Sequence, residues 1–554
     1  MNSVPSVSKE EKTDRRDWTL YWVYPGVAVF VLVLTAYPML DLLSRAFVVD
    51  GQVSAGPLIE LVSSSYNRTV FWNTLLLGAT AAVLGTILAT AYAYAMTRVE
   101  IPGKKIWHFI ALLPTISPPI LMALGLIMLY GRRGFITYEL FGIQTAGLYG
   151  FTGLVIAQLV SYFPFAYLLM LNLFRGLDAS LEEAALTMGA NGWTVLRTVS
   201  LPLLVPGLLA SMLLMFSYSL ADLGNPLLLG GDYPVLSSQI YQMIIGMYDT
   251  SGGAALAVML LIPALIMFFA HKMLSSRMSF ASVGAKGSSR HRVTRHKGVR
   301  AAALVFVGVI TLIICLQYGI ILVAATTQLF GVDYTFTVKH FVAAFTKSRG
   351  ALTDTLLLGV IASLLSVIIG LLIAWIIART KAPGRSILDF VANLPLAIPG
   401  TVIGLAFGLA FNAPPLILTG TAFIIIAAFV VRSLPYGIRT GVAAFDQISR
   451  SLDEASTTMG ATNGQTLWKI LLPIVRPALI AGMIFSFTRS VTTLSAVIFV
   501  VSPHWSLVTP TILSQMDRGD MGEAAALSVI VVVLVLLIIH GVPRLLGRDW
   551  RETD

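Results

Sequence analysis

Two stretches of the chain share one pattern and decide its fold: Glu183-Ala-Ala-Leu-Thr-Met-Gly189 and Glu454-Ala-Ser-Thr-Thr-Met-Gly460. Each is followed at the same distance by a Leu-Pro step, at Leu201-Pro202 and at Leu472-Pro473. The second stretch repeats the first at a displacement of 271 residues. Each predicts a short amphipathic helix, a glycine that ends or bends it, and a second short helix that leads into an apolar run. The chain therefore contains two copies of one surface element.

The residues around these stretches predict how each helix begins and what it presents. Ser180 and Ser451 stand just before acidic residues, which favours an N-cap at each serine and carboxylates in the first turn. Small residues then give each helix a low profile, so that the surface of another protein can approach its backbone closely; they are Ala184, Ala185, Ala455 and Ser456.

The repeat extends outward from these stretches. Asn73-Thr-Leu-Leu-Leu-Gly78 is matched by Asp354-Thr-Leu-Leu-Leu-Gly359 at a displacement of 281 residues. Paired prolines keep this displacement and predict kinked helices, because proline removes a backbone donor. Such breaks are tolerated in a bilayer where neighbouring groups satisfy the freed carbonyls, so we expect both kinked helices to face the protein interior. The prolines are Pro114 and Pro118, and Pro395 and Pro399.

The composition places the chain in a membrane. Hydrophobic residues make up 56% and charged residues 12%, about half the charged fraction of a soluble domain. A spanning helix needs roughly 20 apolar residues, and the chain offers such runs about twelve times. We therefore predict an all-α membrane protein of two homologous six-helix halves. The predicted spans are 20–42, 74–97, 107–130, 150–173, 203–223, 253–274, 301–323, 355–378, 388–410, 417–437, 474–496 and 522–545.

The charge pattern predicts the orientation and the division of the chain. The net charge of +10 comes from basic residues beside the spans, which favours cytoplasmic loops over nucleic-acid binding. Both termini are then cytoplasmic, and the segment from Asp222 to Gly252, which has no Lys or Arg, lies outside. The single cysteine, Cys315, excludes a disulfide within the chain and a cysteine metal cluster. The predicted divisions are an N-terminal tail (1–17), a first half (18–274), a basic cytoplasmic linker (275–300), a second half (301–546) and a C-terminal tail (547–554).

The two motif stretches resemble the signature of permeases of binding-protein-dependent ABC importers, which reads Glu-Ala-Ala, three residues, Gly, nine residues, an aliphatic residue, one residue, Leu-Pro. The resemblance covers nearly the whole chain, and Ser456 in place of the third motif residue is its one departure. It implies a type I permease fold in a bacterial inner membrane and a coupling helix at each motif. The implied ATPase contacts are Glu183, Ala184, Ala185, Gly189, Glu454, Ala455, Ser456 and Gly460.

The same resemblance implies the partners. They are two copies of a cytoplasmic ABC ATPase, which would carry the ATP and Mg, and an extracytoplasmic substrate-binding protein. The chain itself has no phosphate-binding loop, since Gly103-Lys104-Lys105 lacks the leading glycine and the hydroxyl residue of that motif. We therefore expect a permease that is not an enzyme and binds no cofactor or metal, with ATP hydrolysis in a separate subunit.

The cargo is indicated by three further stretches. Leu394-Pro-Leu-Ala-Ile-Pro-Gly400, Ala221-Asp-Leu-Gly-Asn-Pro226 and Ser495-Ala-Val-Ile-Phe499 are similar to permeases of the ferric-iron group, which includes relatives for thiamine, aminoethylphosphonate and sugar phosphates. This resemblance implies import of ferric iron, free or chelated. Import of thiamine or of an anionic organophosphate stays open. An ion-driven secondary transporter is the alternative of a different class, which the duplicated motifs and the scarcity of intramembrane acids disfavour.

Three ionisable residues inside the spans are candidates for the substrate pathway, because such residues are expensive in a bilayer. They are Asp222, Arg432 and Arg489, with Thr488 and Thr492 beside the last. The two guanidinium groups suit a carboxylate or phosphate and would repel a bare ferric ion. In the alternative interpretation, Arg489 pairs with Asp222 and Arg432 reaches a water-filled crevice or the membrane edge. The aligned first-half positions are not basic; they are Ser161 and Tyr218.

Overall fold

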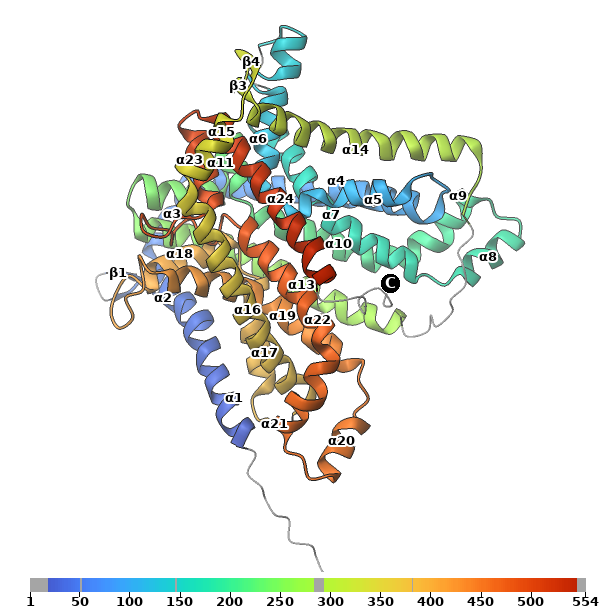
Figure 1. Cartoon of the computed structure of the whole chain (residues 1–554), viewed down its shortest axis with the longest axis vertical. Helices are drawn as coiled ribbons and strands as arrows, with labels where there is room; N and C mark the ends of the chain where they lie inside the picture. The colour runs from blue at the N-terminus through green and yellow to red at the C-terminus, as the bar shows by residue number, and fades with distance from the viewer. Residues whose placement is uncertain (1–17, 50–51, 145–146, 283–292, 381, 546–554) are drawn as a thin grey trace, which may run out of the picture.

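The protein is an almost entirely helical molecule with many long apolar helices (Figure 1). The structure, a computed structural model, describes residues 18–49, 52–144, 147–282, 293–380 and 382–545. In this part of the chain 11 helices are long and apolar enough to cross a membrane, or 12 when one bent pair counts as a span. The prediction of an all-α membrane protein is confirmed. The strands form two small hairpins, β1 (Val48–Val49) with β2 (Gln52–Val53) and β3 (Thr327–Leu329) with β4 (Asp333–Phe336).

The first half is built from six long helical segments and several short ones. Its first span runs from α1 through a π-helical turn into α2 without a break. The short surface helix α8 (Ala179–Thr187) carries the first motif, and α9 (Gly192–Val195) continues through a π-helical turn into α10. The helices are α1 (Trp18–Val31), α2 (Tyr37–Phe47), α3 (Gly56–Ser63), α4 (Ser65–Arg98), α5 (Lys104–Leu112), α6 (Pro119–Tyr130), α7 (Phe151–Gly176), α10 (Leu201–Ala221), α11 (Gly224–Leu229), α12 (Leu236–Tyr241) and α13 (Thr250–Ser282).

The second half repeats this order. The helix α20 (Ser451–Thr458) carries the second motif, and α21 (Asn463–Thr466) continues into α22 (Leu472–Thr492) as α9 does into α10. The second short helix of each copy is thus the first part of a spanning helix and is not separate from it. The other helices are α14 (Lys297–Ala325), α15 (Lys339–Thr346), α16 (Arg349–Arg379), α17 (Arg385–Asn393), α18 (Gly400–Ala410), α19 (Ala422–Asp446), α23 (Val508–Asp517) and α24 (Met521–Leu545).

The paired prolines break two predicted spans. The span predicted at 107–130 is divided between α5 and α6, with extended backbone at Ser117 and Pro118. The span predicted at 388–410 is a pair of helical segments, Arg385–Leu396 and Gly400–Ala410, bent by 108°. The prolines lack the amide that would continue each helix, and the residue before a proline is pushed out of the helical region. Since nearly every residue of α6 and α18 is buried, the predicted interior position of both kinked helices is confirmed.

Other predicted boundaries are corrected by the structure. The span predicted at 417–437 begins later, at Ala422, and runs to Asp446. The segment from Asp222 to Gly252 is not an open loop, because α11 and α12 fold back against α6, α7 and α13 and are largely buried. Helix α13 continues to Ser282 and α14 begins at Lys297, so helices enter the predicted linker from both sides. The predicted tails at 1–17 and 547–554 and the linker residues 283–292 lie outside the described residues.

The first helix of each half crosses over to the other half. Helix α1 packs against α16, α17 and α21 of the second half, and α2 packs against α18 as well as α13. Helix α14 packs in turn against α4, α5 and α6 of the first half and against α24 of its own. The largest buried apolar clusters accordingly combine residues of both halves. The two halves therefore share one core and do not fold as separate units.

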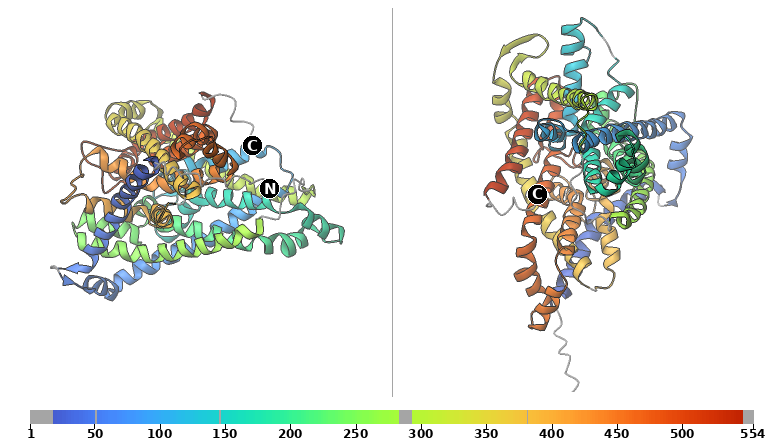
Figure 2. Two further views of the ribbon diagram at one scale, coloured as in Figure 1. Left: turned by 90° about the horizontal axis from the view of Figure 1, so that it is seen from below. Right: turned by 90° about the vertical axis from the view of Figure 1, so that its right-hand side faces the viewer.

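The two bundles run in different directions and carry the motif helices at their far ends. In Figure 1 the helices α4, α7 and α10 run across the molecule toward α8, while α16, α19 and α22 run downward toward α20. The left view of Figure 2 shows the teal segment of α8 at one end of the molecule, beyond the long first-half helices. Each motif helix thus projects beyond its own bundle and is free to contact another molecule.

Candidate functional site: two surface helices and a central cavity

Each motif helix is terminated by its glycine. Gly189 (φ +89°) and Gly460 (φ +83°) adopt the left-handed conformation, which a side chain would make costly. The amide of Ala190 donates to the carbonyl of Ala185 at 3.1 Å, and that of Ala461 to Ser456 at 3.1 Å, the hydrogen bonds of a Schellman motif. The motif glycines therefore end both helices in the same way, as the sequence predicts.

The motif helices begin differently from the prediction. The N-cap of α8 is Asp178, whose carboxylate accepts from the amide of Ser180 at 2.9 Å. In α20 the N-cap is Arg450, and the hydroxyl of Ser449 accepts from the amide of Ser451 at 3.3 Å. The predicted serine caps are wrong, because polar side chains two residues earlier already bind the amides of Ser180 and Ser451.

The exposed surface of each helix combines a carboxylate with an apolar side chain. Glu183 and Glu454 are exposed, as are Ala184 and Ala455 beside them. Met188 and Met459, at the tips, are 87% exposed in both copies. Ala185 is half-buried, and the predicted contact residue Ser456 is buried. The methionines are matched positions that the sequence prediction did not select, although the repeat contains them.

An arginine at the end of α4 ties α8 to the first bundle. The Nε atom of Arg98 lies 3.0 Å from a carboxylate oxygen of Glu182, and its Nη2 atom donates to the carbonyl of Phe174 at 2.9 Å. The guanidinium also lies over the Phe174 ring, 5.7 Å from its centroid. The side chain of Arg98 is only 7% exposed. One buried guanidinium thus joins three elements: α4, the end of α7 and α8.

The second half repeats this arrangement residue for residue. Arg379, at the end of α16, forms an ion pair with Asp453 at 2.6 Å and donates to the carbonyls of Phe445 and Ile448. Its guanidinium lies 6.0 Å from the centroid of the Phe445 ring. We call each of these two sets, Arg98 with Glu182 and Arg379 with Asp453, an arginine anchor. The sequence interpretation used both arginines only for orientation, although their place in the repeat marked them as matched.

One contact within the motif differs between the copies. The hydroxyl of Ser456 lies 2.7 Å from that of Thr466, so α20 is hydrogen-bonded to α21. The aligned positions in the first half are Ala185 and Val195, which have no hydroxyl group. The departure of Ser456 from the motif is therefore accompanied by a second substitution that gives it a partner.

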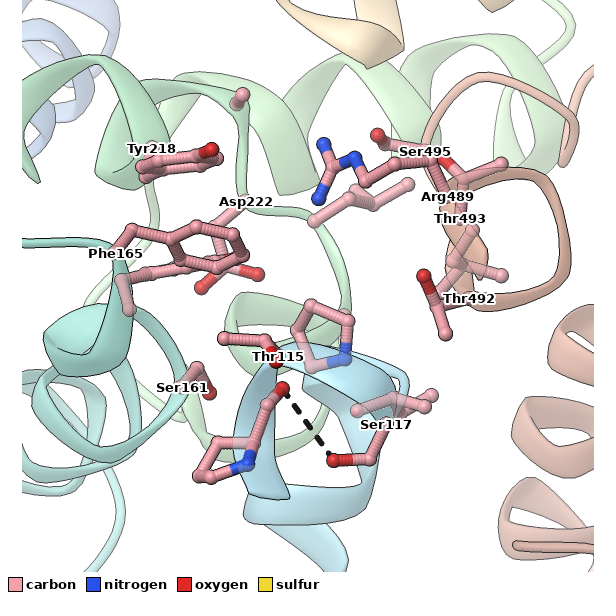
Figure 3. A pocket seen from close by; sticks show the side chains of 18 of the residues that line it. Thr115, Ser117, Ser161, Phe165, Tyr218, Asp222, Arg489, Thr492, Thr493 and Ser495 are labelled. Atoms are coloured by element: carbon pink, nitrogen blue, oxygen red, sulfur yellow. Dashed lines mark hydrogen bonds between the residues drawn. The ribbon is translucent and has the colours of Figure 1, made fainter. Parts of the chain in front are cut away.

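A cavity of about 50 Å³ lies where the two halves meet, away from the motif helices. The first half contributes the broken segment before α6, helix α7 and the end of α10, and the second half contributes α19 and the end of α22 (Figure 3). Among the predicted pathway residues, Asp222, Arg432, Arg489 and Thr492 line it, whereas Thr488 does not. The hydroxyl of Thr488 instead donates to the carbonyl of Ile484 at 2.9 Å.

Asp222 is held by neutral donors of its own half. Its Oδ2 atom accepts from Nε2 of Gln158 at 3.1 Å and from Nδ2 of Asn225 at 2.8 Å, and its Oδ1 atom accepts from the amide of Asn225 at 3.3 Å. The ion pair with Arg489 that the sequence left open is not formed, although both residues line one cavity. The carboxylate is thus satisfied by amides and does not neutralise the arginine.

Arg432 satisfies the backbone at the second proline break. Its Nη1 atom donates to the carbonyls of Pro395 and Ile398, at 3.2 and 3.0 Å, within the bend between α17 and α18. The side chain also borders a second cavity of about 300 Å³ with Tyr436 and Arg439. The arginine therefore has a structural role, and it lies between two cavities and not at the membrane edge.

Arg489 contacts the first half through an aromatic ring. Its guanidinium lies 5.9 Å from the ring centroid of Tyr218, which stacks on Tyr162 and Phe165. Its Nε atom is buried without a hydrogen-bond partner. Tyr218 and Arg489 are aligned positions of the repeat, 271 residues apart. Since equivalent residues touch each other, the axis that relates the halves passes between them, through the cavity wall.

The comparisons with known proteins agree with this arrangement. A family model described as "Binding-protein-dependent transport system inner membrane component" matches residues 81–280 and 366–552, one segment in each half. The chain belongs to this family. Both matched segments of this inner membrane component contain a motif helix, an arginine anchor and the residues of the cavity, so the family assignment covers every part of the candidate site. The chain is accordingly a multi-pass permease.

Individual relatives cover most of the chain or one half of it. The ferric transport system permease protein FbpB of Actinobacillus pleuropneumoniae is 33% identical over 543 residues, 96% of this chain and 76% of its own length. A putative ferric transport system permease protein of Haemophilus influenzae is 33% identical over 486 residues, 86% of this chain and 77% of its own length. The sulfate transport system permease protein CysT of Escherichia coli is 31% identical over 211 residues, 36% of this chain and 76% of its own length.

Proposed function

We propose that this permease imports ferric iron, free or chelated, from an extracytoplasmic binding protein into the cytoplasm by alternating access. The observation that carries the proposal is the duplicated arginine anchor on either side of a cavity between the halves. Each anchor makes a surface helix rigid with its own bundle, so a force on α8 or α20 moves that bundle and not the helix alone. Opposed motion of two bundles about a shared cavity is what alternating access requires.

The surface helices are the proposed docking sites of two copies of a separate ABC ATPase, which holds the ATP and Mg. Met188 and Met459 offer a flexible apolar tip to a groove, and the exposed carboxylates beside them offer an ion pair. In this proposal the ATPase contacts are those that the motif implies: Glu183, Ala184, Ala185, Gly189, Glu454, Ala455, Ser456 and Gly460. The buried Ser456 contributes through the hydroxyl pair with Thr466.

The orientation follows from the same docking sites. With α8 and α20 in the cytoplasm, the basic ends of α4 and α16 and both termini are cytoplasmic as well, in agreement with the excess of Lys and Arg there. The hairpin β3–β4 and helices α11, α12 and α23 then face the binding protein. The halves at 18–274 and 301–546, with the linker at 275–300, remain the proposed division of the chain, although their first helices are exchanged in space.

Two relatives named for ferric transport that match most of the chain support iron as the cargo. An anionic organophosphate is the second candidate, because Arg432 and Arg489 line the cavity and one relative is named for sulfate. The third candidate, thiamine, is a cation and would meet the guanidinium of Arg489.

Transport in proteoliposomes tests the proposal. The permease is reconstituted with its ATPase and with a binding protein loaded with radioactive iron. We expect iron to accumulate only when ATP and the binding protein are both present. Accumulation of an organophosphate in place of iron would replace the cargo, and accumulation driven by an ion gradient without ATP would contradict the importer itself.

A further inference from the structure

The cavity between the halves has a marked excess of positive charge. Two guanidinium groups, of Arg432 and Arg489, and one carboxylate, of Asp222, are the charged groups among the residues that line it. The carboxylate already accepts three hydrogen bonds from Gln158 and Asn225 and forms no ion pair with either arginine. The charge that reaches the cavity is therefore cationic.

Arg489 differs from Arg432 in having capacity left for a ligand. Arg432 uses one guanidinium nitrogen on two carbonyls of the broken helix. Within the described residues no protein acceptor is recorded for Arg489, whose contact is the face of Tyr218 at 5.9 Å. Because the stack of Tyr162, Tyr218 and Phe165 holds that ring, the guanidinium is preset without being neutralised. Figure 3 shows it pointing from α22 across the cavity toward Tyr218 and Asp222.

The remaining polar lining can accept or donate to the same ligand. Hydroxyl groups of Thr115, Ser161, Thr492 and Ser495 surround the space. A volume of about 50 Å³ holds roughly three to five water-sized groups, about the size of a carboxylate or a phosphate group. A planar guanidinium binds such oxygen pairs through two parallel hydrogen bonds, which a single ammonium group cannot reproduce.

We propose that this cavity is an oxyanion site, in which Arg489 binds a phosphate or carboxylate group of the cargo as it passes between the halves. The inference rests on the proposed import function and specifies the cargo further: iron crosses as an anionic complex, through the carboxylate or phosphate groups of its ligand, and not as a bare cation. The site belongs to one half only, because the aligned residue of the first half is Tyr218, which forms its opposite wall.

Anion binding to the purified complex of permease and ATPase tests the site directly. Inorganic phosphate and citrate are titrated at constant ionic strength, with chloride as the reference, and the unfolding midpoint of the complex is followed. The variants are Arg489→Gln, Arg489→Lys and the control Arg476→Gln, an exposed arginine on the same helix. We expect stabilisation of the wild type and of the control, at least tenfold weaker binding in Arg489→Gln, and an intermediate effect in Arg489→Lys.

Two results would overturn the oxyanion site: no stabilisation of the wild type by either anion, or equal stabilisation of all four proteins. The second would mean that the anions bind elsewhere. If Arg489→Gln does not assemble with the ATPase, the comparison of Arg489→Lys with the wild type decides, since lysine keeps the charge and loses the paired donors.

Transport separates this inference from the proposed cargo. If the wild type imports iron and Arg489→Gln imports it equally well, the oxyanion site is wrong and iron import stands. If the wild type imports no iron but binds phosphate in a manner that depends on Arg489, iron is wrong as the cargo and the oxyanion site stands. If iron offered as a citrate complex is imported at least tenfold more slowly by Arg489→Gln, both are supported.

Discussion

The two halves of this permease match at their ends and differ at the cavity between them. At the ends, Arg98 and Arg379 make the same ion pair, the same backbone hydrogen bond and the same ring contact. At the cavity, Tyr218 of one half faces Arg489 of the other, although the two positions are equivalent in the repeat. The difference indicates that force enters the halves symmetrically while the cargo is recognised by one half.

The physical reason lies in what each region must contact. Two identical ATPase copies present two identical grooves, so both anchors are held to the same geometry. A small asymmetric ligand on an axis between two halves cannot use the same residue twice, and two arginines facing each other there would repel across a small cavity. A tyrosine opposite an arginine replaces that repulsion with a contact between the cation and the ring.

The largest effect is expected from exchanging the roles at the cavity. Arg489→Gln should lower ATP-driven uptake at least tenfold, because it removes the unneutralised guanidinium. Tyr218→Phe should lower it less than twofold, since the ring that Arg489 contacts is retained. Uptake by proteoliposomes measures both. Equal losses in the two variants would contradict the asymmetry of the cavity.

The anchors should respond alike in both halves. Arg98→Ala and Arg379→Ala each leave a partly buried carboxylate without its partner, a loss of roughly 1–3 kcal/mol. We expect uptake to fall about tenfold in each variant, with transport per hydrolysed ATP falling too, because the surface helix moves without its bundle. The exposed Arg476→Gln is the control. An effect in one half alone would show that the matched geometry does not imply a matched role.

The motif glycines should give a smaller, matched effect. A side chain in the left-handed conformation costs about 1–2 kcal/mol, and nothing lies within 4 Å of a Cβ atom at either position, so strain of the backbone is the only penalty. Gly189→Ala and Gly460→Ala should each weaken ATPase binding roughly threefold to tenfold, measured by titration of the ATPase into the permease. Gly246→Ala, at an open position without positive φ, serves as the control.

The smallest effect concerns the one contact that differs between the motifs. Ser456→Ala should weaken ATPase binding slightly, because it leaves the hydroxyl of Thr466 without its buried partner, at roughly 1 kcal/mol. The double variant Ser456→Ala with Thr466→Val reproduces the residues of the first half and should restore binding. Failure of the second substitution to compensate the first would mean that Ser456 contacts the ATPase itself.

Local patterns predicted the parts of the site that depend on neighbours in sequence. The prolines gave both breaks, and the motif glycines gave the ends of α8 and α20. The predicted serine caps failed because Asp178 and Ser449, two residues earlier, already accept from the amides concerned. Competition between nearby side chains for one amide is decided by their conformations, which sequence spacing does not reveal.

Contacts between distant segments could not be predicted in the same way. The membrane made Asp222 and Arg489 natural partners, yet Gln158 and Asn225 surround the carboxylate instead. The role of Arg432 depends on a bend 34 to 37 residues earlier in the chain, whose freed carbonyls it satisfies. The arginine anchors bring together residues 84 and 74 positions apart. The repeat marked these arginines as matched but did not identify their acceptors.

The sequence by itself determined the environment, the number of halves and the family, because apolar run length, a displaced repeat and a short motif are properties of the chain alone. The tertiary structure decided that the first helix of each half packs against the other half, and that Tyr218 meets Arg489 across the axis between them. Inside a bilayer every helix is apolar, so hydrophobicity does not choose its neighbours. Close packing and a few hydrogen bonds make that choice, and both exist only once the helices have come together.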